Sequence, residues 1–176
     1  MISNIKNKIG ILLAKRRFVR HQKHDRSFQR FFSKSKDVLI ILPNLEKDFI
    51  VEVFEIVRFT AIHKKKLFLI HKPELQKYLP TDFEYSSLVI SELDKSRLEL
   101  PTKDLVNRIK KYTFDLVIDL NLEDDLFSSA LSNIPLSDFR IGFIKRNSDL
   151  FYNYQIPREI NSEKSYRNLL NSLRMF

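Results

Sequence analysis

The stretch Phe114-Asp-Leu-Val-Ile-Asp-Leu120 decides the fold of this chain. It is a short, nearly continuous apolar run, which is typical of a strand buried on both faces of a parallel sheet. Four similar runs lie at residues 37–42, 67–70, 87–90 and 139–143. The sequence therefore predicts a buried parallel sheet of about five strands.

Segments with helical periodicity separate these apolar runs. Apolar residues that recur every three or four positions predict helices at about residues 46–65, 103–112, 124–133 and 162–174. Parallel neighbours need crossover connections, so alternating strands and helices predict a three-layer Rossmann-like α/β fold. No Pro- or Gly-rich linker divides residues 37–176, which we expect to form one domain.

The positive charge is concentrated at the N-terminus. Residues 1–36 contain eleven Lys or Arg against one acid, Asp25, and carry +10, whereas residues 37–176 hold 20 basic and 21 acidic residues and carry −1. The chain is thus a nearly neutral α/β domain preceded by a basic arm, residues 1–36. Between the charges, apolar residues recur at roughly helical spacing, which predicts an amphipathic basic helix: Ile2, Ile5, Ile9, Leu12 and Val19.

The basic side chains of the arm are candidates for binding a polyanion, because Lys and Arg neutralise phosphates of nucleic acids or of anionic membranes. Arg suits bidentate phosphate contacts and the apolar stripe is narrow, so we expect RNA or a ribonucleoprotein rather than a membrane surface. The alternative is a solvated terminal helix whose charge serves only solubility. The candidate residues are Lys15, Arg16, Arg17, Arg20, Lys23, Arg26 and Arg30.

Three aromatic residues follow the basic cluster: Phe28, Phe31 and Phe32. Exposed rings there can stack on nucleic-acid bases. We expect instead that they dock the arm onto the domain by ordinary apolar burial.

Composition excludes several chemistries. The chain has no Cys and only two Gly, too few for a dinucleotide-binding turn or a P-loop, and it has no Gly-flanked Ser nucleophile. His21 and His24 lie among basic residues, which disfavours a metal ion, while His63 and His71 are expected at the surface. We expect no metal and no cofactor.

Targeting signals are weak as well. Residues 9–14 are too short an apolar run for a secretory signal, and no run approaches the ~18 residues of a membrane span. We expect a cytoplasmic protein, with a peripheral membrane position as the alternative.

A ligand site is expected at the carboxyl edge of the sheet, near the point where strand order reverses. Residues 43–48 and 121–125 would form this edge. Its carboxylates can serve as a general base or hold a divalent cation. Alternatively, Asp124 and Asp125 favour the start of the next helix and Asp119 accepts hydrogen bonds from loop backbone.

The segment Val-Leu-Ile-Ile-Leu-Pro-Asn-Leu-Glu-Lys-Asp at residues 38–48 resembles the opening strand and loop of family 9 glycosyltransferases, the bacterial lipopolysaccharide heptosyltransferases. Residues 114–121 and 140–143 are similar to that family's later strands, so the resemblance spans about residues 37–155. It implies the acceptor-binding Rossmann-like half of such an enzyme. In the family, an Asp at the position matching Asp48 is proposed to deprotonate the acceptor hydroxyl. An enzyme of this kind would have Asp48 as its general base and Asn44, Asp119 and Asn121 at the cleft.

Two features depart from that family. Lys47 stands where the family usually has Gly, and the sequence ends before the domain that would bind the sugar nucleotide. One half alone cannot close around donor and acceptor. We therefore expect a non-catalytic binding or adaptor module. The alternatives are a glycosyltransferase-like subunit that acts on a sugar or lipid-linked acceptor and needs a partner for its donor, and a peripheral membrane protein.

The segment Phe-Asp-Leu-Val-Ile-Asp-Leu-Asn-Leu-Glu-Asp-Asp at residues 114–125 also resembles a group of short Bacteroidetes proteins. The basic start and the leucine-rich closing helix of this chain share in that likeness. The likeness implies a similar architecture and no particular activity.

Overall fold

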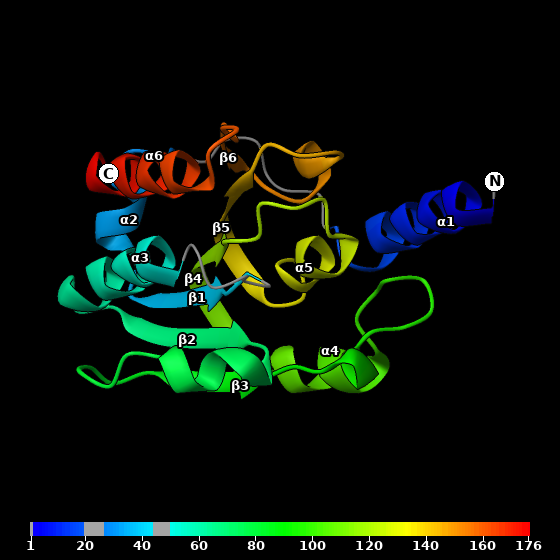
Figure 1. Ribbon diagram of the computed structural model, residues 1–176, viewed down its shortest axis with the longest axis horizontal. Helices are drawn as coiled ribbons and strands as arrows, with labels where there is room; N and C mark the ends of the chain where they lie inside the picture. The colour runs from blue at the N-terminus through cyan, green and yellow to red at the C-terminus, as the bar shows by residue number, and fades with distance from the viewer. Residues whose placement is uncertain (1, 20–26, 44–49) are drawn as a thin grey trace.

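The computed structural model describes residues 2–19, 27–43 and 50–176 (Figure 1). A six-stranded sheet runs through its centre in the order β3-β2-β1-β4-β5-β6, and all neighbouring strands are parallel. This confirms the Rossmann-like α/β fold. The strands are β1 (Asp37–Ile41), β2 (Lys66–His71), β3 (Ser86–Val89), β4 (Thr113–Asp119), β5 (Leu136–Phe143) and β6 (Tyr154–Ile156).

Helices cover both faces of the sheet (Figure 1). One face carries α2 (Phe31–Lys34), α3 (Ile50–Ile62) and α6 (Ser162–Arg174); the other carries α1 (Ile2–Arg17), α4 (Lys103–Ile109) and α5 (Leu126–Leu131). Side chains alternate along each strand, so Val38 and Ile40 enter the core under α3 and α6, whereas Leu39 and Ile41 enter the core under α4 and α5. Among the described residues, the connections contain three 3₁₀ helices, η2 (Pro73–Tyr78), η3 (Glu92–Asp94) and η4 (Ser148–Leu150).

The edge strand β6 was not predicted from the sequence. It has three residues, of which only Ile156 is buried, so it lacks an apolar run. It pairs with the end of β5, where Gly142 lies beside the Tyr152 ring. A Cβ at position 142 would come within 2.6 Å of that ring, so glycine is what lets Tyr152 pack over the strand.

The helix α6 agrees with the prediction for residues 162–174. The Asn161 side chain caps it by accepting a hydrogen bond from the backbone N–H of Lys164 at 3.2 Å. The apolar stripe of α6 faces the sheet and is buried: Tyr166, Leu169, Leu170 and Leu173. The helix α5 is shorter than predicted because Asp125 is its N-cap rather than part of its first turn.

The N-terminal segment forms a helix, α1, but its buried ridge is not the predicted apolar stripe. Gly10, Ala14 and Phe18, each four residues apart, are buried near α5, while Ile9 is 44% and Leu12 67% exposed. A Cβ on Gly10 would lie 2.9 Å from both the Leu98 carbonyl oxygen and a Leu126 methyl. Because glycine has no side chain, α1 can come this close to the domain along the ridge of Gly10, Ala14 and Phe18. This is why that ridge faces inward.

The aromatic residues near the end of the arm dock onto the domain, as predicted. Phe31 and Phe32 are buried, and the half-buried Phe28 packs against Phe139 and Tyr154, with ring centroids 5.5 and 5.7 Å away. The buried rings of Phe31 and Phe32 are therefore not available to stack on bases. The two described helices of the arm, α1 and α2, thus each bury residues in one of the two hydrophobic cores of the domain.

Candidate functional site

A hollow opens at the carboxyl edge of the sheet, between β1 and β4, where strand order reverses. Water-sized groups can occupy about 30 Å³ of it, the hollow is open to solvent, and its apolar lining includes Phe127 and Ile90. The location agrees with the prediction from strand order, since Asn121 and Asp125 line it. The polar side chains around the hollow are Lys72, Ser91, Glu92, Lys95, Asn121, Asp125 and Ser128.

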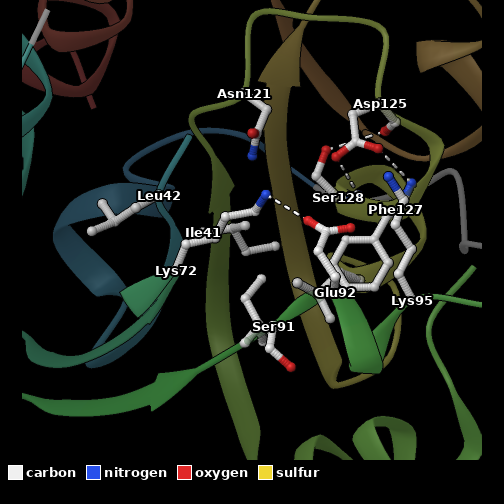
Figure 2. A pocket seen from close by; sticks show the side chains of 12 residues that line it. Ile41, Leu42, Lys72, Ser91, Glu92, Lys95, Asn121, Asp125, Phe127 and Ser128 are labelled. Atoms are coloured by element: carbon white, nitrogen blue, oxygen red, sulfur yellow. Dashed lines mark hydrogen bonds and ion pairs between the residues drawn. The ribbon is translucent and has the colours of Figure 1, made fainter. Parts of the chain in front are cut away.

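The charges around this hollow balance. Lys72 bridges to Glu92 at 2.8 Å, as Figure 2 shows, and this hydrogen bond, with the charge of Lys72, lowers the pKa of Glu92. Lys95 pairs with Glu99 and lies near Asp125. Burial by itself would lower the pKa of Lys95, but the hydrogen bond to Glu99 and the neighbouring acids raise it overall. The lining of the hollow therefore contains two cations, Lys72 and Lys95, and two carboxylates, Glu92 and Asp125.

Asp125 caps α5, as the structural alternative predicted. Its carboxylate accepts hydrogen bonds from the backbone N–H groups of Phe127 at 3.0 Å and Ser128 at 3.4 Å (Figure 2). Burial raises the pKa of Asp125, and the charge of Lys95 opposes the rise. The two acids before it are exposed, and Glu123 pairs with Arg158 at 3.1 Å.

Asp119 lies just behind the hollow and is fully buried. One carboxylate oxygen accepts hydrogen bonds from the backbone N–H and the side-chain amide of Asn121, at 3.0 and 2.6 Å. The other accepts from Lys145 Nζ at 3.3 Å and from the Tyr152 hydroxyl at 2.5 Å. Both oxygens are thus engaged, and Asp119 fixes the loop that carries Asn121 into the wall of the hollow.

Lys145 and Tyr152 were missed by sequence reasoning. The Lys145 side chain is 2% exposed and also donates to the Asn121 carbonyl at 3.0 Å, while the Tyr152 hydroxyl also contacts Ser129 Oγ at 3.0 Å. Burial, followed by the charge of Asp119, raises the pKa of Tyr152 far above its ordinary value. Lys145 and Tyr152 stand 26 and 33 residues from Asp119, so no local spacing signals the contact.

The other predicted site residues divide into two groups. Lys15, Arg16 and Arg17 are exposed at the end of α1, and Arg30 is exposed just before α2 with a φ of 59°. The remaining ones lie outside the described residues, so their roles stay predictions: Asn44, Asp48, Arg20, Lys23, Arg26 and the pair His21 and His24.

The prediction for His71 was wrong. His71 ends β2, is fully buried, and its Nδ1 lies 2.9 Å from the Lys72 carbonyl. Its Nε2 has no hydrogen-bond partner among residues 2–19, 27–43 and 50–176. Within these ranges, no three His, Asp or Glu side chains come together as a metal site would require, and no helix is long and apolar enough to cross a membrane.

The basic surface of α1 is distinct from the hollow. In the part of α1 whose side chains are described, Lys6, Lys8 and Lys15 to Arg17 are all exposed. No ion pair within the described chain involves any of these five cations. A second hollow is lined by residues of α1, of the loop before α4 and of the segment at the start of α5, among them Lys6, Arg97 and Asp124.

Comparisons with protein-family models, curated proteins and solved structures found no match. The resemblance to family 9 glycosyltransferases therefore stays a prediction from residues 38–48, 114–121 and 140–143.

Proposed function

We propose that this protein is an α/β binding module whose helix α1 contacts a polyanion. The observation that supports this most directly is the exposure of Lys15, Arg16 and Arg17 on a helix that is docked to the domain through Ala14 and Phe18. Residues 1–24 contain no acid that could neutralise these charges locally. The charge of α1 is thus available to a partner.

The docking of α1 onto the domain favours this proposal over the alternative, a frayed terminal helix whose charge serves only solubility. Ala14 and Phe18 belong to the same core as the buried residues of α4 and α5, so the helix has a fixed orientation on the domain. Cations held on a fixed surface lose less conformational freedom on binding than cations on a mobile tail. Their contacts with phosphates release counterions, which makes the affinity depend steeply on salt.

The test measures elution from immobilised heparin, and binding to an RNA homopolymer, over a range of salt concentrations. We expect Arg16→Glu with Arg17→Glu to abolish retention near physiological salt. Lys110→Glu with Lys111→Glu is the matched control, because both residues are exposed beyond α4 and the change in charge is identical. Equal elution of these two double variants would mean that net charge, not α1, causes the binding.

The hollow supports a second candidate function, the binding of a small hydroxyl-rich ligand. Its lining combines the Lys72–Glu92 pair, Lys95 and Asp125 with the hydroxyl of Ser128, the amide of Asn121 and the Phe127 ring. Balanced charges favour a neutral polyol over an anion, because no net charge attracts one. A sugar acceptor, as the glycosyltransferase resemblance implies, has this chemistry, and a partner would have to supply the donor.

Glucose and mannose are suitable probes for this candidate. Titration at millimolar concentrations should shift the backbone amide resonances of Ser91 and Asn121 in NMR spectra. Lys95→Ala should weaken the effect, whereas Lys103→Ala, an exposed residue of α4 outside the hollow, should not. Spectra that do not change with either sugar would contradict the candidate.

A further inference from the structure

We infer that the polyanion contacted by α1 is the surface of an anionic lipid bilayer. The inference rests on the proposed function and names its partner. The decisive observation is that α1 has two apolar ridges and the domain covers only one. Gly10, Ala14 and Phe18 are buried, whereas Ile9 and Leu12 remain 44% and 67% exposed on the other side.

Basic side chains lie on and beside the exposed ridge of Ile9 and Leu12. Helical geometry places Arg16 on the same stripe as Ile9 and Leu12, because these positions differ by three or four residues. Lys8 and Lys15 lie beside that stripe, and both are exposed. Aliphatic side chains flanked by Lys and Arg form the pattern of helices that lie in the membrane interface.

Other exposed apolar residues do not form such a surface. Leu93 and Ile160, for example, are almost fully exposed, but each stands next to an acid, Glu92 or Glu159. Single exposed apolar residues are common on globular proteins and require no explanation. On α1 the exposed pair is one turn apart on one helix face and has no acid nearby in the sequence.

The same surface suits RNA less well. Proteins that bind single strands stack bases on exposed aromatic rings, but Phe18 of α1 is buried, as are Phe31 and Phe32. Aliphatic side chains such as Ile9 and Leu12 gain little from a phosphate backbone. In the interface of a bilayer, by contrast, both would leave water while the cations meet lipid phosphates.

The shape of the molecule permits this contact. Figure 1 shows α1 extending from the side of the domain, beyond α5, with its N-terminus farthest from the sheet. The ridge Gly10, Ala14 and Phe18 faces the domain, so the ridge of Ile9 and Leu12 faces away from it. The helix can therefore lie on a flat surface without undocking.

The experiment is flotation of the full chain with two kinds of vesicle, phosphatidylcholine alone and phosphatidylcholine mixed with phosphatidylglycerol. We expect flotation only with the anionic mixture. Arg16→Glu with Arg17→Glu should weaken partitioning by more than about 30-fold, because about 30-fold is the loss expected for removing two cations and the two added carboxylates are also repelled. Ile9→Ser with Leu12→Ser should weaken it by about tenfold at unchanged charge.

Leu93→Ser with Ile160→Ser is the matched control for the apolar change, since both residues are exposed away from α1. It should float like the parent protein, and circular dichroism should show that every variant is folded. If Ile9→Ser with Leu12→Ser also floats like the parent, the apolar ridge plays no part and the inference is wrong.

Heparin and RNA binding, measured on the same samples, separate the two proposals. A protein that binds these polyanions but neither vesicle overturns the bilayer inference and leaves the proposed function standing, with RNA as the partner. A protein that binds no polyanion of any kind overturns both.

Discussion

The helices α1 and α6 both have an apolar stripe visible in the sequence, yet the domain buries the stripe of α6 and leaves Ile9 and Leu12 of the α1 stripe exposed. In α6 the stripe of Tyr166 and three leucines has no rival, because the opposite face is polar. In α1, apolar and small residues occupy two faces. The ridge with Gly10 and Ala14 lies inward because it allows the closer approach.

The difference shows what periodicity does and does not specify. A periodic apolar pattern predicts a helix and a face that favours burial. Where two such faces compete, the shape of the surface that receives the helix decides between them. The large aliphatic residues of the face that is not buried then remain exposed to solvent, where a partner can contact them.

Buried and exposed charges differ in the same way, and this difference gives the largest expected change in unfolding free energy. Lys145 is buried against Asp119, whereas Lys8 of α1 is exposed. Lys145→Met should cost about 3–5 kcal/mol of unfolding free energy, since it leaves a buried carboxylate without its cation. Lys8→Met should cost less than about 0.5 kcal/mol. Urea denaturation measures both.

Adding Asp119→Asn to Lys145→Met should recover part of the stability, because the uncompensated charge is gone. A loss below about 1 kcal/mol for Lys145→Met alone would show that the pair is not essential to the fold.

Leucine truncation tests the two apolar stripes directly. Leu169→Ala in α6 should lose about 2–5 kcal/mol, because the side chain is fully buried and a cavity remains. Leu12→Ala in α1 should stay within about 0.5 kcal/mol of the parent. Thermal and urea unfolding both report the difference, and equal losses in the two variants would mean that the stripe of α1 is buried in solution.

A smaller effect is expected where α1 approaches the domain. Gly10→Leu should cost about 1–3 kcal/mol, although leucine is the better helix former, because its Cβ meets the Leu98 carbonyl. Hydrogen exchange in α1 should accelerate. Lys8→Leu, on the exposed side of the same helix, is the control and should leave both quantities unchanged.

The smallest effect concerns the end of α5 that lies near α1. The folded state raises the pKa of Asp125, so the folded protein holds this proton more tightly than the unfolded chain does. The unfolding free energy should therefore fall as pH rises from the ordinary pKa of 3.8 to the raised value, and stay level above it.

Asp125→Asn retains a good N-cap for α5 but has no proton to titrate. This part of the pH dependence should disappear in the variant, as measured by urea unfolding at several pH values. An unchanged pH profile would assign the dependence to other carboxylates.

Much of the fold could be predicted from local patterns. The strand at residues 114–120 and the α6 helix both depend on neighbours close in sequence. The place of the hollow could be predicted too, because strand order in a parallel sheet fixes the crevice. The hydrogen-bond partners of Asp119 could not be predicted, because Lys145 and Tyr152 follow β5 in the sequence and lie far from Asp119 along the chain.

The sequence by itself determined the alternation of strands and helices, the neutral domain and the +10 arm, because each is a property of composition or local spacing. Only the tertiary structure decided that β6 adds an edge strand, that Lys145 neutralises Asp119, and that Ile9 and Leu12 face outward. These outcomes depend on which surfaces meet, and close packing between distant segments, rather than periodicity, selects them.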